Sequence, residues 1–188
     1  MIMGKKRIIV ALTGASGINY ALDFLQALKA KGFEIHLVLS PWAERLVAEE
    51  TSSSVEDVKK LADFVHDVND LAAPIASSSF LVEAMVVIPC TVKTFSEIAS
   101  ANCSNLIARA ADNLLKTRGK LIVCPRETPL SAPALNNLYR LALYGAIVFP
   151  LCPGFYHRPK DLKDLNAFIT GKLLDLLGVE NQAFKRWQ

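Results

Sequence analysis

Residues 7–17 of the chain are Arg7-Ile8-Ile9-Val10-Ala11-Leu12-Thr13-Gly14-Ala15-Ser16-Gly17. The apolar run predicts a buried strand, and the small residues after it, followed by a helical pattern, predict a strand that turns directly into a helix. Such a turn presents free backbone N–H groups to an anion. We interpret it as a binding turn for a phosphate or a polar cofactor, with a plain tight turn as the alternative.

The glycine spacing in this turn disfavours ordinary dinucleotide binding. Counting from Gly14, the G-x-G-x-x-G pattern needs glycine at positions 16 and 19, where the chain has Ser16 and Asn19. The T-G-x-x-x-G-x-G turn of short-chain dehydrogenases also fails, because Ile18 and Tyr20 occupy its later glycine positions.

Length and composition predict one α/β domain over residues 1–188. The chain is 52% hydrophobic and 21% charged, with a net charge of +3. This small charge is unclustered, which argues against nucleic acid as the main partner. We expect a cytoplasmic protein, because no apolar segment has the length of a signal peptide or a membrane span. The cysteines have no metal-ligand spacing and lie in apolar surroundings that predict reduced, mostly buried thiols: Cys90, Cys103, Cys124 and Cys152.

Apolar runs alternate with helical patterns along the rest of the chain. After the opening strand we expect strands at 35–39, 84–89, 121–124 and 146–149, with a small strand near 64–66. Helices are expected at 18–31, 42–50, 91–101, 104–116, 134–143 and 161–178, with a short helix after Ser54. This order predicts a three-layer, doubly wound and mostly parallel sheet with helices on both faces.

Polar residues follow each expected strand, at the sheet edge where α/β proteins bind ligands. They are Gly14, Ala15 and Ser16; Ser40; Thr91, Lys93 and Thr94; Arg126 and Glu127; and Tyr156, His157 and Arg158. Hydroxyls, cations and a carboxylate at successive strand ends indicate a site for a phosphorylated, planar ligand. The alternative is that each residue is an ordinary helix cap or a solvated loop charge.

Two loops between prolines strengthen the prediction of a site. Residues 125–129, Pro-Arg-Glu-Thr-Pro, hold a cation and a carboxylate side by side, as acid–base and phosphate chemistry needs. Residues 153–159, Pro-Gly-Phe-Tyr-His-Arg-Pro, hold aromatic rings and cations, which suits a pocket for an apolar group and an anion.

At these residues the chain resembles the UbiX-type flavin prenyltransferase family, which is related to flavin-dependent cysteine decarboxylases. The similar motifs are spread over nearly the whole chain: Thr-Gly-Ala-Ser-Gly at 13–17, Pro-Cys-Thr-Val-Lys-Thr at 89–94, Arg-Ala-Ala-Asp at 109–112, Leu-Lys at 115–116, Pro-Arg-Glu-Thr-Pro-Leu at 125–130 and Gly-Phe-Tyr-His-Arg-Pro at 154–159. Each motif is modest alone, and their order and spacing make the combination specific.

The resemblance implies transfer of a dimethylallyl group from dimethylallyl monophosphate to N5 and C6 of reduced FMN. The product, prenylated FMN, would serve a separate UbiD-type decarboxylase. The resemblance also implies a flavodoxin-like fold, a homo-dodecamer and no metal. It assigns FMN binding to Gly14, Ala15, Ser16, Ser40, Thr91, Val92, Lys93, Thr94, Arg109 and Arg126. It assigns dimethylallyl phosphate binding to Tyr156, Lys172, Lys116, Arg126 and Trp187, and catalytic roles to Ser16, Glu50, Glu127 and Lys116.

The chain departs from the family pattern at several positions. Members usually have Ser at Thr91, Gly at Ser78 and Ala101, and in many cases Arg at Lys172. Thr91 keeps a hydroxyl and Lys172 keeps a charge, so we expect function to survive with less bidentate phosphate geometry. Ser78 lies in a loop expected near the flavin or a neighbouring subunit.

Two other functions compete with flavin prenylation. An FMN-dependent decarboxylase of a cysteine-containing substrate would share the fold, but those relatives have Pro-Ala-Met-Asn where this chain has Pro125-Arg126-Glu127, and His66 is a poor match to their catalytic histidine. A non-catalytic FMN-binding subunit of a decarboxylase complex would have no need for Glu127, Lys116 and Tyr156.

Overall fold

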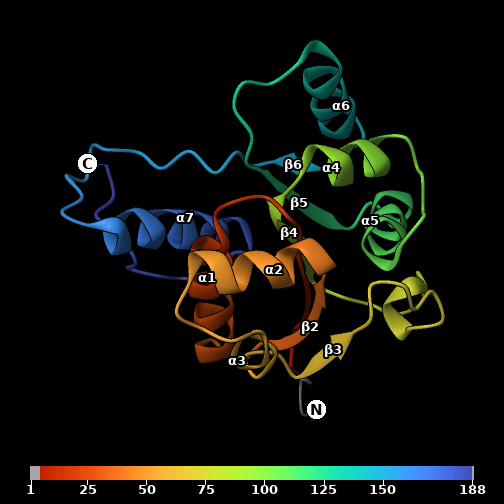
Figure 1. Cartoon of the computed structure of the whole chain (residues 1–188), viewed down its shortest axis with the longest axis horizontal. Coiled ribbons are helices and arrows are strands. Elements are labelled where there is room, and N and C mark those ends of the chain that lie inside the picture. Colours follow the sequence, from red (N-terminus) through yellow and green to blue (C-terminus); the bar gives the residue numbers. More distant parts are fainter. Residues whose placement is uncertain (1–4, 188) are drawn as a thin grey trace.

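The structure is a computed structural model that describes residues 5–187. Its centre is a six-stranded sheet in the order β3-β2-β1-β4-β5-β6, in which every strand pair is parallel (Figure 1). The strands are β1 (Arg7–Leu12), β2 (Glu34–Leu39), β3 (Phe64–His66), β4 (Ala84–Cys90), β5 (Lys120–Pro125) and β6 (Ile147–Val148). The predicted doubly wound parallel sheet is confirmed.

Helices α1 to α6 lie between successive strands, as parallel pairing requires, and α7 follows the last strand. They are α1 (Ile18–Ala30), α2 (Pro41–Glu50), α3 (Val55–Lys59), α4 (Val92–Ala99), α5 (Leu106–Thr117), α6 (Ala132–Leu143) and α7 (Leu162–Leu176), with a 3₁₀ turn η1 (Pro74–Ala76). All the predicted helices are present, with ends within a few residues of those expected. The turn η1 was not predicted.

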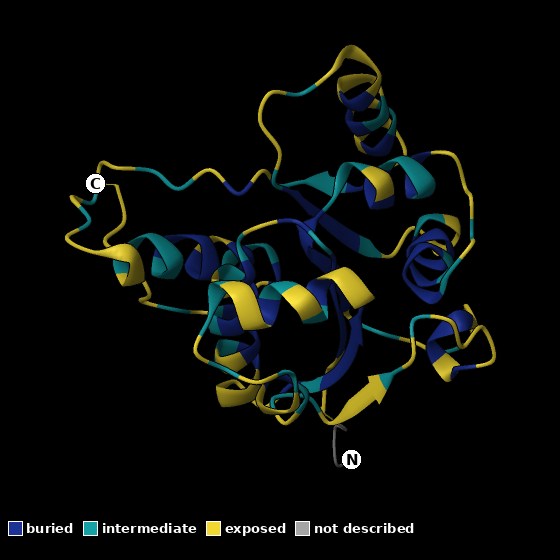
Figure 2. Ribbon diagram, viewed as in Figure 1, coloured by how far each residue is buried: buried dark blue, intermediate teal, exposed yellow. Residues whose placement is uncertain are grey.

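The sheet is buried on both faces, which explains why its strands have continuous apolar runs. Alternate residues of β1 pack to opposite sides: Ile8 and Val10 join the apolar cluster with α1 and α7, whereas Ile9 and Ala11 join the cluster with α4, α5 and α6. Figure 2 shows the central strands and the inward helix faces as buried. Consequently, α5 and α7 lie on opposite faces of the sheet.

Side-chain caps fix where the helices begin. Ser40, Thr91, Asn105, Ser131 and Asp161 each accept a hydrogen bond from a backbone N–H in the first turn of the helix that follows. Ser40 and Thr91 directly follow β2 and β4, so the caps also place hydroxyls at the carboxyl edge of the sheet.

The cysteines only partly follow the prediction of buried thiols. Cys90 and Cys124 are buried in the sheet, and burial raises the pKa of both thiols. Cys103 is half-buried and Cys152 is exposed, because the segments around them run over the surface. Among residues 5–187, no helix combines the length and apolar character needed to cross a bilayer.

Candidate functional site

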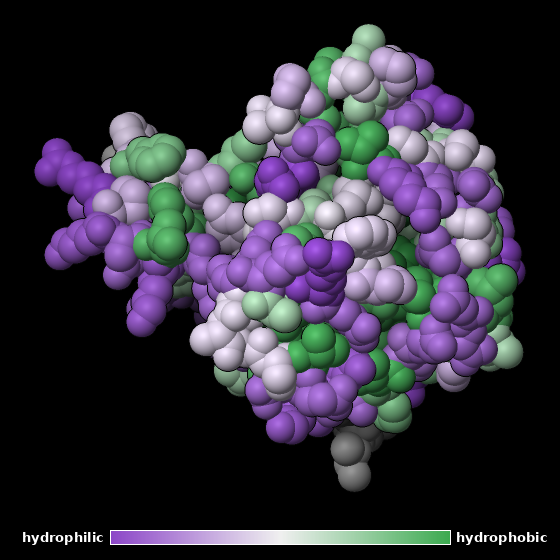
Figure 3. Space-filling model, in the orientation of Figure 1, coloured by the Kyte–Doolittle hydropathy of each residue, from purple (hydrophilic) through white to green (hydrophobic). Residues whose placement is uncertain are grey.

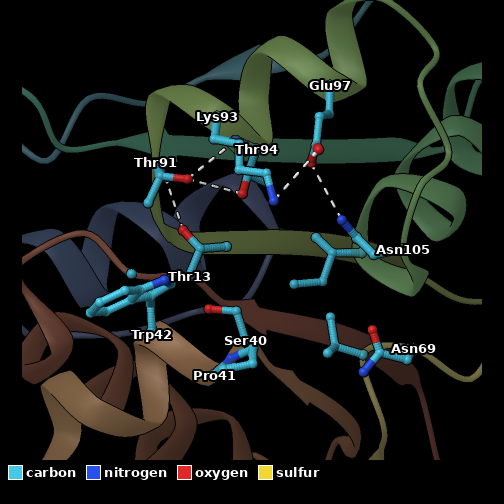
Figure 4. Close-up of a pocket in the computed structure, with 13 residues that line it drawn as sticks. Thr13, Ser40, Pro41, Trp42, Asn69, Thr91, Lys93, Thr94, Glu97 and Asn105 are labelled. Atoms are coloured by element: carbon cyan, nitrogen blue, oxygen red, sulfur yellow. Dashed lines mark hydrogen bonds and ion pairs between the residues drawn. The ribbon is translucent and has the colours of Figure 1, made fainter.

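A cavity of about 570 Å³ opens at the carboxyl ends of β1, β2 and β4. The strand-end residues predicted from the sequence that line it are Gly14, Ser40, Thr91, Lys93 and Thr94, and Thr13, the first residue of the opening turn, lines it as well. In Figure 4, the residues of α4 lie on one side of the cavity, and Ser40, Pro41 and Asn69 lie on the other. The structure therefore brings residues from separate strand ends together, as the parallel topology predicts.

The N-terminus of α4 forms one wall of this cavity. Thr91 caps the helix by accepting a hydrogen bond from the Thr94 N–H at 3.2 Å, and its own hydroxyl donates to Thr94 Oγ1 at 3.0 Å. Thr13 joins β1 to this cap, because its Oγ1 accepts the Thr91 N–H at 2.9 Å and its hydroxyl donates to the Pro89 carbonyl at 2.8 Å. The first-turn N–H groups and Lys93 therefore offer a rigid site for a phosphate.

The other walls suit a planar, partly polar ligand. Trp42, Val68 and Ile107 contribute apolar surface, and Asn69 and Asn105 contribute amides. The Glu97 carboxylate, which also lines the cavity, accepts hydrogen bonds from Ser104 and Asn105 and lies 3.7 Å from Lys93 Nζ. Its charge is thus compensated, and the most favourable place for an anion is the Thr91 end.

Gly14 lets α2 approach the turn after β1. A Cβ on Gly14 would overlap the Cβ of Trp42, so only glycine fits there. The neighbouring Ala15 is buried and Ser16 is exposed, and neither residue lines the cavity. Gly17 has a φ of 112°, in the region that favours glycine.

Ser16, Glu50 and Arg126 meet at this turn. Glu50 Oε2 accepts the N–H groups of Gly17 at 2.8 Å and Ile18 at 3.0 Å, and Arg126 Nε donates to the Ser16 carbonyl at 3.0 Å. Burial raises the pKa of Glu50, but these N–H groups, the Ser16 hydroxyl and the Arg126 charge outweigh burial and hold the pKa below its ordinary value. Glu50 is therefore an anion that can accept a proton.

Glu127 has a different environment. It is exposed, and its Oε1 accepts the Thr128 N–H at 3.1 Å. The burial that would favour a protonated Glu127 is thus not supplied by the part of this chain that the structure describes. A ligand phosphate or a second subunit would have to provide it.

Tyr156 and Trp187 meet at the C-terminal end of the chain. Their rings lie edge to face with centroids 5.5 Å apart, and Tyr156 also packs edge-on against Phe168 of α7 at 5.8 Å. Lys172 lies exposed on the same helix. In Figure 3 the lobe that contains the start of α7 and the C-terminal tail carries apolar and polar side chains next to one another.

Arg109 and Lys116 of α5 lie apart from these groups. Arg109 Nε donates to the Ala76 carbonyl at 3.2 Å, and Lys116 is paired with Asp112. Lys116 lines a second hollow of about 610 Å³ with Arg118 and Arg140, on the α4–α6 side of the sheet. Neither residue lines the cavity at Thr91. The exposed Ser78, in the loop that Arg109 contacts, does not line it either.

Sequence reasoning missed seven residues of the cavity: Pro41, Trp42, Val68, Asn69, Glu97, Asn105 and Ile107. Val68 and Asn69 follow β3, so extending the strand-end rule to the small strand at 64–66 would have found them. The position of Asn105 directly before α5 is a cap signal. For Glu97 and Ile107, which lie within helices, the sequence contains no comparable signal.

Comparisons with known proteins are consistent with this geometry. The model of the Flavoprotein family matches residues 2–166. The flavin prenyltransferase UbiX of Methanocaldococcus jannaschii is 43% identical over 181 residues, which cover 96% of this chain and 98% of the relative.

Two solved structures are similar over nearly the whole chain. A crystal structure of AnUbiX (PadA1) in complex with FMN and dimethylallyl pyrophosphate has a TM-score of 0.96 and 42% identity, and the match covers 98% of each chain. A dodecameric FMN-dependent Ubix-like decarboxylase from Escherichia coli O157:H7 has a TM-score of 0.94 and 40% identity, covering 97% of this chain and 99% of that one.

Proposed function

This chain belongs to the Flavoprotein family, among its UbiX-type flavin prenyltransferases, and on that premise we propose that it transfers a dimethylallyl group from an allylic phosphate to reduced FMN. The observation that carries the proposal is the cavity at the carboxyl ends of β1, β2 and β4, with the capped N-terminus of α4 as its anion-binding wall. We propose that residues 1–188 form one flavin-binding domain.

The residues around the cavity fit FMN. Thr91, Val92, Lys93 and Thr94 would hold the phosphate at the N-terminus of α4, with Ser40 on the opposite wall. Gly14 and Trp42 would border the flavin rings. Reduced FMN supplies the nucleophilic N5 and C6 positions to which the prenyl group is joined.

The turn after β1 would place Ser16, Glu50 and Arg126 beside the reacting edge of the flavin. Arg126, held by the Ser16 carbonyl, would stabilise the negative charge on the leaving phosphate. Because Glu50 is held as an anion, it is the candidate to accept a proton at the flavin edge. Glu127 would donate a proton to the phosphate once the bound phosphate or a second subunit covers its exposed carboxylate.

Tyr156, Lys172 and Trp187 would bind the prenyl donor. An allylic carbon becomes electron-poor as its phosphate departs, and the faces of aromatic rings stabilise such a charge by about 1–2 kcal/mol per ring when water is excluded. Lys172 would bind the phosphate as a point charge. This mixture of rings and a cation is what the donor requires.

We propose that Arg109 and Lys116 complete the donor site from a neighbouring subunit. Within one chain they lie on α5, on the opposite face of the sheet from α7 and Lys172. Large apolar side chains exposed on α6, namely Leu135, Tyr139 and Leu143, provide surface for such an assembly. A homo-dodecamer, as in the Escherichia coli structure, is the assembly we propose.

Mass spectrometry of the flavin tests the proposed reaction. The protein is incubated anaerobically with reduced FMN and either dimethylallyl monophosphate or dimethylallyl pyrophosphate. We expect a flavin heavier by one five-carbon unit with at least one donor. Recovery of unmodified FMN with both donors would contradict the proposal.

Two parallel measurements separate the alternatives. Release of carbon dioxide from a peptide with a C-terminal cysteine, in the presence of oxidised FMN, would indicate a cysteine decarboxylase. FMN binding without either reaction would indicate a binding subunit. A Ser16→Ala variant that binds and prenylates FMN normally would show that the turn after β1 is only scaffold.

We further propose that prenylated FMN passes to a UbiD-type decarboxylase. The test is whether a filtrate of the reaction activates such a decarboxylase prepared without its cofactor. A cytoplasmic location stays a prediction from the sequence.

A further inference from the structure

The C-terminal tail, residues 179–187, folds back along α7. Gly171 makes this possible, because a Cβ at that position would lie 2.6 Å from the Phe184 ring and 2.9 Å from Asn181 Oδ1. Asn181 Nδ2 donates to the Gly171 carbonyl at 3.2 Å and to Asp175 Oδ1 at 2.9 Å. Gly171 and Asp175 of α7 therefore define the path of the tail.

Asp175 holds the end of this tail through a two-point ion pair. Arg186 Nη1 lies 2.9 Å from Asp175 Oδ2, and Nη2 lies 2.7 Å from Oδ1, which is the geometry of a strong guanidinium–carboxylate pair. The hydrogen bonds from Arg186 lower the pKa of Asp175, and those from Asn181 and the charge of Lys172 lower it further. Asp175 therefore faces the tail, where Asn181 and Arg186 both donate to it.

The residue after Arg186 is Trp187, whose ring meets that of Tyr156 edge to face, with centroids 5.5 Å apart and an angle of 88°. Trp187 is 77% exposed, so this one edge-to-face contact contributes little toward fixing it. The ion pair one residue earlier is the stronger constraint. A change at Asp175 would thus displace Trp187 from Tyr156 without touching either ring.

We propose that Asp175, which lies on the same helix as Lys172, is a positioning residue for the prenyl donor. Through Arg186, Asp175 holds Trp187 against Tyr156. This inference rests on the proposed function, which assigns Tyr156, Lys172 and Trp187 to dimethylallyl phosphate. It adds a residue whose carboxylate acts on donor binding through the tail.

The test compares Asp175→Asn with the wild-type protein in the full chain. We expect KM for dimethylallyl monophosphate to rise about tenfold, as displacement of a substrate-positioning group does, while the Kd for FMN stays unchanged. In a Trp187→Ala background, Asp175→Asn should raise KM no further, because the two residues act in series. An equal rise in both backgrounds, or an unchanged KM, would overturn the proposal.

Asp57→Asn is the matched control. Asp57 is likewise in an ion pair, with Lys60, and accepts hydrogen bonds from the Ser54 cap, so Asp57→Asn removes an ion pair at a site remote from the tail. We expect this control to leave KM unchanged. A rise in KM equal to that of Asp175→Asn would mean that general destabilisation explains the effect, and it would overturn the proposal.

Two further readouts do not need turnover. Trypsin cleaves after Arg186 only when this side chain leaves Asp175, so Asp175→Asn should speed release of the Trp187–Gln188 dipeptide severalfold. Calorimetric titration of dimethylallyl monophosphate into the protein loaded with oxidised FMN should show weaker binding. If the wild type makes no prenylated flavin, the proposed function fails, and these two measurements still decide whether Asp175 fixes the tail and the ligand.

Discussion

Glu50 lies far along the chain from the turn after β1, yet it accepts both backbone N–H groups at the start of α1. Its ionised carboxylate supplies the acceptors that a side-chain cap provides elsewhere, because Gly17 at the N-cap has no side chain. Glu50 thus ties α2 to the turn that borders the flavin cavity. Its charge is expected to serve stability as well as proton transfer.

Replacing Glu50 with glutamine tests the stability role. The pKa of Glu50 is lowered in the folded chain, so its contribution is present at neutral pH and is lost as the pH falls through the folded pKa. We expect Glu50→Gln to lower the free energy of unfolding by about 1–2 kcal/mol at pH 7. Urea unfolding at several pH values should show the difference from wild type shrinking below about pH 4. A difference that is constant with pH would contradict this.

A second residue-scale prediction concerns Gly14. Gly14→Ala would push the Trp42 backbone, and with it α2, away from the turn. We expect a loss of about 1–3 kcal/mol in stability, measured by urea unfolding, and weaker FMN binding. Gly145→Ala is the control, since Gly145 has a φ of 95° and open space around it. This control should lose stability through backbone strain and keep its FMN affinity, so equal loss of affinity in both variants would refute the role of Trp42 packing.

The site was predictable from sequence only where strands deliver residues to it. Gly14, Ser40 and Thr91 each follow an apolar run, so the rule that ligands bind at strand ends locates them. Glu97 reaches the cavity from the second turn of α4, and its position depends on how that helix packs. Likewise, the separation of Lys116 from Lys172 depends on which face of the sheet each helix covers, which no local pattern specifies.

At the scale of elements, α4 is the helix whose capped N-terminus we propose as the binding site of the FMN phosphate. Thr91→Ala should cost about 1 kcal/mol of stability through loss of the cap. It should also weaken FMN binding by about three- to tenfold, because the N–H groups that face the phosphate lose their alignment. Thr91→Ser should restore both, and fluorescence titration of FMN measures the effect.

Ser131→Ala provides a matched control for Thr91. Ser131 caps α6 with the same geometry and does not line the flavin cavity. We expect the same loss of stability with unchanged FMN affinity. If Ser131→Ala weakens FMN binding as much as Thr91→Ala does, the cap of α4 has no specific role in the site.

Most helices and strands were predictable because their apolar residues follow a regular spacing and a cap or turn residue marks where they begin or end. Gly32 and Gly178, with φ of 76° and 71°, stand just past the ends of α1 and α7, as expected of helix-ending glycines. β6 is shorter than predicted: only Ile147 and Val148 are assigned to the ladder with β5, although Phe149 still donates to the Val123 carbonyl at 2.8 Å. The three-residue turn η1 is too short for its apolar residues to form a repeating pattern.

At the scale of the whole molecule, the proposed division of the donor site between two subunits makes a prediction about mixtures of variants. Lys116→Ala and Ser16→Ala should each be nearly inactive alone. When their subunits are dissociated and reassembled together, up to roughly a quarter of wild-type activity should return, because some sites then combine an intact α5 from one chain with an intact turn from another. The measurement is prenylated flavin formed per active site.

Arg109→Ala mixed with Lys116→Ala is the control for this experiment. Both residues lie on α5, so every site would still receive a defective helix and no activity should return. No recovery in the first mixture would place Lys116 and Ser16 within a single chain, and recovery in the control would place Arg109 and Lys116 of one site on different chains; either result would contradict the proposal.

The strand order also affects how the chain emerges from the ribosome. β1, β2 and β3 are made first and pair with one another, but the other edge of β1 waits for β4, which begins at Ala84. At synthesis rates of about 5–20 residues per second, that apolar edge stays unpaired for roughly one to five seconds after β3 is made. An open strand edge recruits other strands, so this edge of β1 is exposed to wrong pairing until β4 is made.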